Sequence, residues 1–288
     1  MSLNRFILVL AIALCAATCG KNAKRDASEQ VSEKYAQIVA LLNAQQEPDV
    51  THLKQVAVLL NSKPYLMPAQ ADTVRTLFHL YQQLCADAIA QRTENDLDII
   101  SRSGNRIRSR MNALIQACDT LTAYGIQVYI AEGMVQTEIL PLFEIQVFDH
   151  YITPCERAIA RLQQIEAEDP SQEDESIIVD MTKITQRLAA CDSMMTTYAN
   201  DTLLPVIDDM RMTYLAMLMY GTDNTPAFDW QGNHMNAPTR AAIKSYVTQY
   251  PAAFSTPLLK TYLALLQTAD FNRNSDIDIF ISQTFAIQ

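Results

Sequence analysis

Apolar side chains recur along this chain at steps of three and four residues, which is the spacing of one buried face of an α-helix. The clearest stripes run from Val74 to Ile89, from Ile107 to Leu121 and from Ile177 to Tyr198. We expect helices near residues 29–45, 49–61, 69–97, 104–123, 142–167, 174–199, 203–219, 238–249, 256–268 and 275–286. The alternating segment 126–130, followed by Glu132-Gly133, fits a small β-hairpin near residues 126–140. The pattern therefore predicts an all-α fold with this hairpin as its β-structure.

Part of the pattern occurs twice. The motif Phe-x-x-Tyr-x-x-x-Cys-x-x-Ala-Ile-Ala begins at Phe78 and again at Phe148, and Ala-Cys-Asp begins at Ala117 and again at Ala190. Each copy has the length of one helical hairpin. We interpret this as an internal duplication, in which both hairpins belong to one antiparallel helical bundle.

The duplication suggests a domain organisation. The two hairpins lie near residues 65–124 and 141–198, inside a bundle that we expect over residues 29–220. Residues 221–288 then form a loop and C-terminal helices packed on the bundle. A chain of this length can bury a sizeable hydrophobic core.

Four cysteines lie on the apolar stripes: Cys85, Cys118, Cys155 and Cys191. In an antiparallel hairpin, residues equidistant from the turn lie level with each other. The spacing therefore favours disulfides Cys85–Cys118 and Cys155–Cys191, which an oxidising compartment allows. Four buried free thiols are the alternative, because cysteine is among the most buried residue types. No CxxC pair occurs and no histidine lies at ligand spacing from a cysteine, so we expect no metal at these residues.

The first residues have the layout of a secretory signal: Arg5, the apolar run Phe6–Ala17 and small residues that end at Cys19. The run is too short to cross a bilayer, which takes about 20 apolar residues. The segment 16–19 resembles the lipobox of bacterial lipoprotein precursors, although Ala16 and Thr18 stand where that class usually has Leu and a Gly or Ala. The resemblance implies that residues 1–18 are removed and that Cys19 is lipidated. Ordinary signal cleavage, which would give a soluble periplasmic protein, is the alternative.

The expected cellular location and partners follow from this segment and from the net charge. Residues 19–28 carry charges and no apolar pattern, so we expect a tether that joins a lipid anchor to the helices. The protein is then lipid-anchored in the bacterial cell envelope, either periplasmic or surface-exposed. The chain has 22 basic and 32 acidic side chains, a net charge of −10, which argues against binding nucleic acid. The expected partners are the membrane, through the anchor, and an unidentified envelope protein or glycan.

The turns of the two expected hairpins carry opposite charges. The first turn is basic, with Arg102, Arg106, Arg108 and Arg110, whereas the second, from Glu166 to Glu175, is acidic. Arginines near a helix start oppose the helix dipole, so these four are candidates for binding an anion or an acidic partner. The favoured alternative is mutual neutralisation, because both turns lie at one end of an up-down-up-down bundle.

Motifs of catalysis and cofactor binding are absent: the chain has no HExxH, GxSxG, P-loop or dinucleotide fingerprint. We therefore assign no catalytic residue and no cofactor. Oxygen ligands at alternate positions near the C-terminus resemble a calcium loop: Asp270, Asn272, Asn274, Asp276 and Asp278. Ser275 and Ile281 stand where such a loop has its Gly and its bidentate Glu. A polar turn that caps the last helix is thus the favoured interpretation, and calcium is the alternative.

A long non-helical loop runs from Gly221 to Trp230, the single tryptophan of the chain. Phe228 and Trp230 are candidates for a recognition surface, but a plug at the end of the bundle is the favoured interpretation. Together with Ala131-Glu132-Gly133, Tyr250-Pro251 and the segment 262–266, this loop resembles all-helical lipoproteins of Bacteroides-like bacteria. The resemblance covers about residues 125–288. It implies an all-helical fold and a location in the cell envelope, and it implies no activity.

These features predict a cell-envelope lipoprotein that acts as a binding or scaffolding module. One alternative is an envelope enzyme with a site between the bundle and the C-terminal helices. Another is a glycan- or peptide-binding protein. An enzyme should show acids or bases with perturbed pKa values that converge in a deep pocket. A scaffold should instead show a shallow apolar or charged patch.

Overall fold

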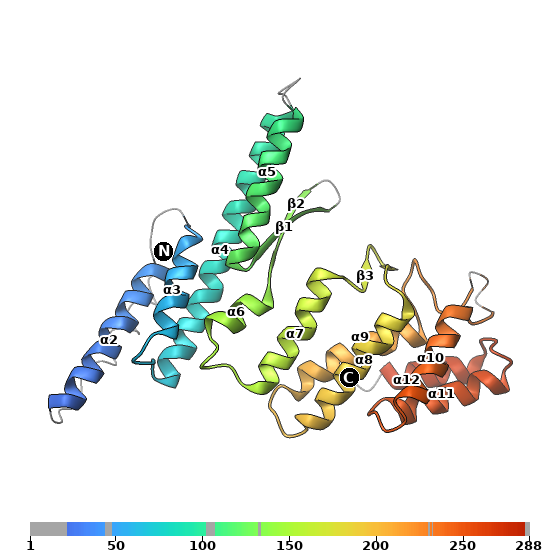
Figure 1. The fold of residues 1–288 in the computed structure, drawn as a ribbon. Helices are drawn as coiled ribbons and strands as arrows, with labels where there is room; N and C mark the ends of the chain where they lie inside the picture. Colours follow the sequence, from blue (N-terminus) through green and yellow to red (C-terminus); the bar gives the residue numbers. More distant parts are fainter. Residues whose placement is uncertain are drawn as a thin grey trace, which may run out of the picture. The chain divides into compact units, whose positions relative to one another are not determined.

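The computed structural model describes residues 22–43, 48–101, 107–131, 134–229, 231 and 233–285, and for 22–27, 107–109 and 131 it describes the backbone alone. This part of the chain is mainly helical, with two small antiparallel sheets (Figure 1). The predicted all-α fold with a small β-hairpin is confirmed. No helix in the described ranges is long and apolar enough to cross a membrane. The chain divides into two compact units between Ile152 and Thr153.

Unit 1 packs its helices and one hairpin around a single core. Its elements are α2 (Asn22–Leu42), α3 (Thr51–Asn61), α4 (Pro68–Ser101), α5 (Ile107–Leu121), a 3₁₀ turn (Thr122–Tyr124), β1 (Ile126–Ala131), β2 (Met134–Ile139) and α6 (Pro141–Val147). In the β1–β2 hairpin, Ile126 pairs with Ile139 and Ala131 pairs with Met134. This is the β-hairpin that the alternating sequence predicts near residues 126–140.

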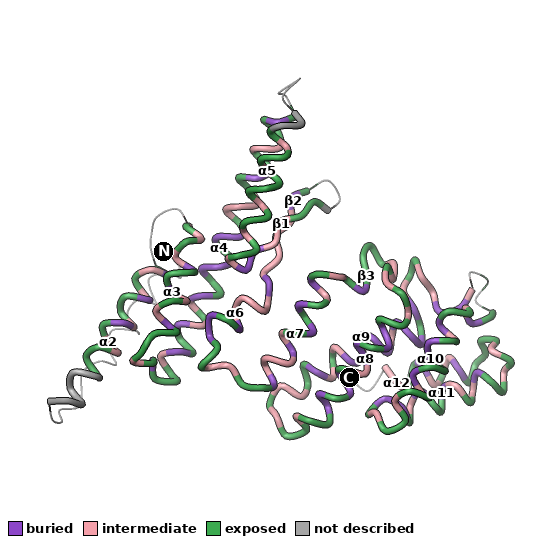
Figure 2. Tube along the Cα trace, in the orientation of Figure 1, coloured by how far each residue is buried: buried purple, intermediate pink, exposed green. Residues whose placement is uncertain are grey.

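The core of unit 1 lies where α3 and α4 meet the segment around Phe148. Phe78 and Phe148 are both fully buried, and their rings meet edge to face with centroids 5.4 Å apart. Helix α5 adds little to this core: it contributes no buried side chain over residues 110–121 (Figure 2). The stripe on α5 is therefore only half-buried against α4.

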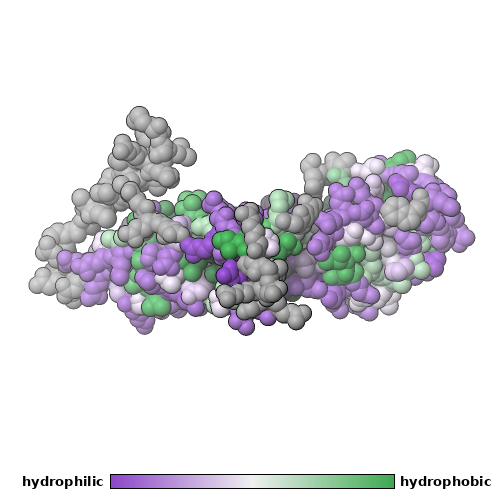
Figure 3. All heavy atoms as spheres, turned by 90° about the horizontal axis from the view of Figure 1, so that it is seen from above, coloured by the Kyte–Doolittle hydropathy of each residue, from purple (hydrophilic) through white to green (hydrophobic). Residues whose placement is uncertain are grey.

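Unit 2 is a helical domain with its own, larger core. Its elements are α7 (Pro154–Glu168), β3 (Gln172–Glu173), β4 (Ser176–Ile177), α8 (Met181–Thr197), α9 (Leu204–Met219), α10 (Ala237–Gln249), α11 (Thr256–Thr268) and α12 (Ser275–Phe285). Side chains from α7 to α12 share one buried cluster, at whose centre lie Leu215, Tyr246 and Tyr262. Hydrophobic residues on the face seen in Figure 3 form separate patches in a mainly hydrophilic surface.

The helix expected over 142–167 is broken, and the break explains the division into units. α6 ends at Val147, and α7 begins at Pro154 with a capping box between Thr153 and Glu156. Proline suits the first turn of a helix because the missing N–H would be unpaired there, so Pro154 starts a new helix. The segment 148–153 between them is not helical.

The sequence duplication is not a structural repeat. The first copy of the motif lies within one helix, α4, whereas the second crosses the boundary between the units. Phe148 belongs to the core of unit 1, while Cys155 and Ile159 belong to that of unit 2. The single bundle expected over 29–220 is thus divided, and α10 to α12 share a core with α8 and α9. At the other end, α2 begins at Asn22, so most of the expected tether 19–28 is helical.

Candidate functional site

The loop that follows α9 folds back on itself through backbone hydrogen bonds. Gly221 has a left-handed backbone with φ +86°, which glycine adopts without strain. The amide of Ala227 donates to the carbonyl oxygen of Tyr220 at 2.9 Å, and that of Thr222 donates to Thr225 at 3.0 Å. A side chain at residue 221 would place its Cβ 2.4 Å from Thr225 O and Ala227 N. The loop is therefore tightly closed at its start.

Phe228, a candidate for a recognition surface or for a plug at the end of the helices, lies inside the core of unit 2. Only 3% of the residue is exposed, which fits the plug, the favoured interpretation. The guanidinium of Arg273 lies over its ring, 5.6 Å from the centroid. Trp230, the other candidate, lies outside the described residues.

A small cavity of about 140 Å³ lies against this loop, within unit 2. Its lining combines aromatic, acidic and basic side chains: Tyr220, Thr222, Asp223, Pro226, Phe228, Asp229 and Arg273. Drug-sized ligands occupy pockets of about 300–1,000 Å³, so this cavity accepts one small group rather than a whole large ligand. Tyr220 at its wall is 52% exposed, which is high for an aromatic side chain.

The acidic turn of unit 2 is hydrogen-bonded to this loop. Asp174 and Glu175, in the turn between β3 and β4, have positive φ angles of 46° and 57°. Their carbonyl oxygens accept hydrogen bonds from Asn224: the Asn224 side chain donates to Asp174 at 2.7 Å, and its backbone N–H donates to Glu175 at 3.0 Å. Thr225 accepts a further bond from the amide of Ile177, at 3.1 Å. The loop is thus attached to the β3–β4 hairpin by its own polar residues.

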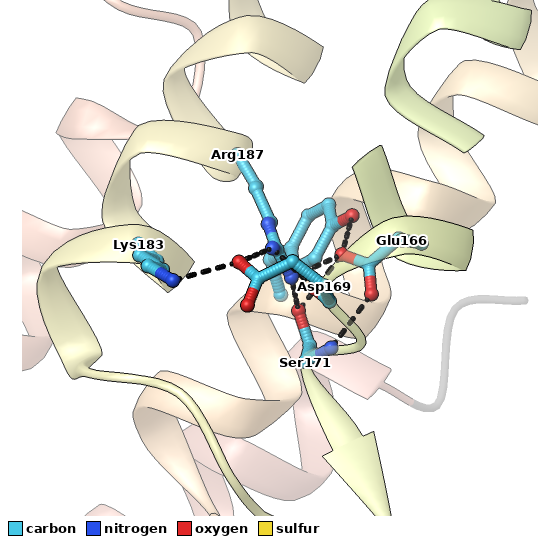
Figure 4. A network of polar contacts seen from close by, with 6 residues as sticks. Glu166, Asp169, Ser171, Lys183 and Arg187 are labelled. Carbon is cyan, nitrogen blue, oxygen red and sulfur yellow. Dashed lines mark hydrogen bonds and ion pairs between the residues drawn. The ribbon is translucent and has the colours of Figure 1, made fainter. Parts of the chain in front are cut away.

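A polar network around Arg187 of α8 binds the segment that leads from α7 into the β3–β4 hairpin (Figure 4). Arg187 is 4% exposed and donates to Glu166 at 2.8 Å, to the Asp169 side chain at 2.9 Å and to the hydroxyl of Ser171. Tyr214 donates to the same Glu166 carboxylate at 2.6 Å. Burial, together with this hydrogen bond, raises the pKa of Tyr214 well above its usual range. The arginine thereby joins α8 to the end of α7 and to Ser171, the residue before β3.

A second buried network surrounds Asp192, which is 1% exposed. Its carboxylate accepts hydrogen bonds from the Tyr246 hydroxyl and from Ser255, whose backbone N–H and hydroxyl lie at 2.8 and 2.7 Å. Arg211 donates to the Ser255 hydroxyl at 3.3 Å. Burial and the bond to Asp192 raise the pKa of Tyr246. The network ties α8 to α10 and to the start of α11.

Neither network was identified from the sequence, although a signal for both exists. Arg187 follows Ile184 by three residues, and Asp192 follows Leu188 by four, so both charged side chains lie on the apolar face of α8. A charge on a buried face is seldom tolerated unless it is paired and hydrogen-bonded. That position therefore predicts a buried network, but its partners come from other helices and cannot be read from α8 alone.

The arginine cluster of the first turn is mostly outside the described residues. Arg102, Arg106 and the side chain of Arg108 lie there, while Arg110 is exposed on α5. In the acidic turn, by contrast, two acids form ion pairs within unit 2. Glu166 pairs with Arg187, and Asp169 pairs with both Arg187 and Lys183, the latter at 2.8 Å. These two acids therefore have cationic partners in their own hairpin.

The predicted disulfides Cys85–Cys118 and Cys155–Cys191 are wrong, because all four cysteines are free thiols. Helix α4 ends at Ser101 and α5 begins at Ile107, so the two helices pair about a point that lies beyond the midpoint of Cys85 and Cys118 in the sequence. Cys118 consequently hydrogen-bonds with the side chain of Thr93, about 12 Å along α4 from Cys85.

The second cysteine pair is separated in a similar way. Cys155 hydrogen-bonds with Asp201, beyond the end of α8, whereas Cys191 lies more than one turn before that end. Burial raises the pKa of Cys85 and of Cys191 to about 12, so both thiols stay protonated. The alternative of buried free thiols fits Cys85, Cys155 and Cys191, while Cys118 is half-buried.

The calcium-like turn is a helix cap. The side chain of Asn274 accepts from the amide of Ile277 at 3.0 Å, which caps α12, and Asp278 pairs with Arg273 at 2.6 Å. Asn272 bonds backbone oxygens of its own turn at Ala269 and Asp270. Over the described ranges, no three His, Cys, Asp or Glu side chains converge as metal ligands. The contacts of Asn272, Asn274 and Asp278 fit the polar-turn interpretation, and Asp276 lies in the first turn of α12.

Comparison with known proteins gives this chain no relative: no protein-family model, no curated protein and no solved structure matches it. The functional assignment therefore rests on the residues themselves.

Proposed function

We propose that this protein is a lipid-anchored cell-envelope protein that acts as a binding or scaffolding module. The anchoring part of the proposal rests on the sequence of residues 1–19, in which the apolar run Phe6–Ala17 leads to Cys19. Bacterial lipid modification supplies more than one acyl chain, and a single chain would bind a membrane only marginally.

The binding part rests on one observation, the pocket beside the loop after α9. Binding residues are often placed on loops that a rigid scaffold positions, and this loop is fastened to the β3–β4 hairpin by Asn224 and Thr225. The pocket combines a few charged groups with an exposed aromatic side chain, as small-molecule binding sites do.

The ionisable groups of unit 2 favour binding over catalysis. Tyr214, Tyr246 and Cys191 all have raised pKa values, so at neutral pH they stay protonated and are poor nucleophiles. Their carboxylate neighbours Glu166 and Asp192 already accept several hydrogen bonds each. These groups hold the helices together and supply a rigid support for the loop.

The anchoring proposal is tested by labelling cells with a fatty-acid analogue that can be detected after purification. We expect label on the wild-type protein and on Cys15→Ala, and no label on Cys19→Ala. Cys15 is the matched control, because it lies in the apolar run that is removed under either type of cleavage. Equal labelling of the Cys19→Ala protein, with normal processing, would contradict the lipid anchor.

A further inference from the structure

We propose that the pocket beside Tyr220 binds one ring of a neutral carbohydrate. This inference rests on the binding role proposed above and names its ligand class. The polar side chains that line the pocket have hydrogen-bonding capacity that the described part of the chain does not use.

Two carboxylates supply hydrogen-bond acceptors. Asp229 accepts from the amide of Asn233 at 2.9 Å through one oxygen, and its second oxygen has no hydrogen-bond donor among the described residues. Asp223 is exposed, and its carboxylate likewise has no hydrogen bond or ion pair with a described residue. A carboxylate can accept several hydrogen bonds, so both can receive hydroxyl groups.

One guanidinium supplies the donors. Arg273 uses its Nε to donate to Asp278 at 2.6 Å, and its plane lies over the ring of Phe228. Its two terminal nitrogens make no hydrogen bond within the described part of the chain. The ring contact and the bond to Asp278 orient the group, so its remaining N–H donors are held at the wall of the pocket.

The remaining wall suits the apolar face of a sugar ring. Tyr220 is half-exposed and Pro226 lies beside it in the lining, so the two offer a non-polar surface next to the charged groups. The hydroxyl of Thr222, also in the lining, is buried and has no hydrogen-bond partner among the described residues. Because this hydroxyl is shielded from solvent, the polar groups open to a ligand are those of Asp223, Asp229 and Arg273.

The same groups disfavour other ligand classes. The two carboxylates repel a ligand that carries a phosphate or carboxylate, and Arg273 repels a ligand that carries an ammonium group. An extended peptide binds through a row of unpaired backbone groups, but the loop amides of Ala227, Asp229 and Met235 already donate to backbone oxygens. A neutral polyol uses donors, acceptors and the aromatic wall together. Because the cavity is small, one ring enters and the rest of the glycan lies outside.

The test is ligand-observed NMR on the full-length protein in detergent. The probes are neutral oligosaccharides of glucose, galactose, mannose and N-acetylglucosamine. We expect at least one of them to bind, and Tyr220→Ala and Asp223→Asn each to weaken it about tenfold or more. Tyr129→Ala is the matched control, because Tyr129 is a 42% exposed tyrosine that belongs to unit 1 and not to the pocket lining, so this variant should bind like wild type.

Three outcomes would overturn the carbohydrate proposal. One is that none of the sugars binds at millimolar concentration. Another is that binding is unchanged in both pocket variants, each shown by circular dichroism to be folded. The third is that inorganic phosphate or a lysine methyl ester binds at Tyr220 instead. Co-purification of an envelope protein that Tyr220→Ala abolishes, with no sugar bound, would overturn the ligand class and leave the binding role intact.

Discussion

At the scale of single residues, two side chains that the apolar pattern places on the buried face of α8 carry charge and organise unit 2. Arg187 donates to three residues at the end of α7 and just beyond it: Glu166, Asp169 and Ser171. Asp192 accepts hydrogen bonds from Tyr246 and Ser255. Such groups contribute stability only while their partners remain, because a buried charge without a partner is costly.

Arg187→Met should destabilise unit 2 by about 2–4 kcal/mol. This lies toward the lower end of the roughly 3–5 kcal/mol lost when a fully buried pair is broken, since the side chains of Glu166 and Asp169 are partly exposed. Lys183→Met is the matched control, because Lys183 is half-exposed and its pair with Asp169 is worth only about 0–1 kcal/mol. Urea unfolding of both variants measures the difference. Equal losses would show that the buried network has no special role.

The thiols of the four cysteines should differ in reactivity. Cys118 is half-buried, whereas Cys85 and Cys191 are buried and have pKa values of about 12. Since the thiolate is the reactive form, iodoacetamide at pH 8 should modify Cys118 first and leave Cys85 and Cys191 protected until urea is added. Mass spectrometry of peptides reports the order. Recovery of a Cys85–Cys118 or Cys155–Cys191 peptide would restore the disulfide hypothesis.

Glu144 gives unit 1 a dependence on pH. Burial alone would raise its pKa, but hydrogen bonds from His79 at 3.0 Å and from Arg75 at 2.5 Å outweigh burial and lower it. A carboxyl group whose folded pKa lies below its unfolded value contributes stability above the unfolded value, about 4.5, and loses it as the pH falls through the folded pKa.

Glu144→Gln should therefore cost about 1–2 kcal/mol at pH 7 and less at pH 3. Glu94→Gln, an exposed change on α4, should cost little at either pH. Urea unfolding at the two pH values is the measurement. A cost that stays constant between pH 7 and pH 3 would mean that the carboxylate charge is not the cause.

At the scale of secondary-structure elements, the residues that connect the helices determine where each element begins and where the chain turns, which helical periodicity does not show. Thr153 and Pro154 start α7, and Gly125 allows the chain to turn from α5 into β1. The backbone of Gly125 is left-handed, with φ +73°, and its carbonyl oxygen accepts from Leu140 at 2.8 Å. The position joins the β-hairpin to α6, so it should tolerate no larger residue.

Gly125→Ala should destabilise unit 1 by about 2–4 kcal/mol. A Cβ there would lie 2.5 Å from two atoms of Phe143, and the left-handed backbone adds a cost of roughly 1–2 kcal/mol to that of overpacking. Thr122→Ala in the same turn should cost under about 1 kcal/mol, because it removes only an exposed hydrogen bond to Asp119. Thermal unfolding compares them. Wild-type stability of Gly125→Ala would mean that Phe143 moves aside freely.

At the scale of the whole molecule, the chain has two separate hydrophobic cores. The buried residues of one cluster end at Phe148, and those of the other begin at Cys155. Because each core is formed by a continuous stretch of chain, each unit has the contacts that it needs to fold alone.

The fragments 22–152 and 153–288 should therefore each be helical and unfold cooperatively when expressed separately. Circular dichroism with urea unfolding checks this. A single-residue change in one fragment, such as Arg187→Met, should leave the unfolding midpoint of the other fragment unchanged. If either fragment folds only when the other is added, the cores depend on each other.

The sequence by itself determined the fold class and the approximate positions of most helices, but not the break at Pro154 or the β3–β4 hairpin. Helix positions follow from apolar residues at steps of three and four, and the alternation in 126–130 identified the β-hairpin, because both patterns are local consequences of backbone geometry. The expected helix 256–268 and the observed α11 coincide, and the expected 203–219 differs from α9 by one residue.

Only the tertiary structure decided which residues meet. A repeated motif suggested two equivalent hairpins, yet Phe148 packs in one unit and Cys155 in the other, because a proline and a cap divide the segment. Cysteines at matched spacing do not meet, because the turns are offset by several residues. The pocket unites Tyr220 and Arg273, which are far apart in sequence, and periodicity holds no information about such contacts.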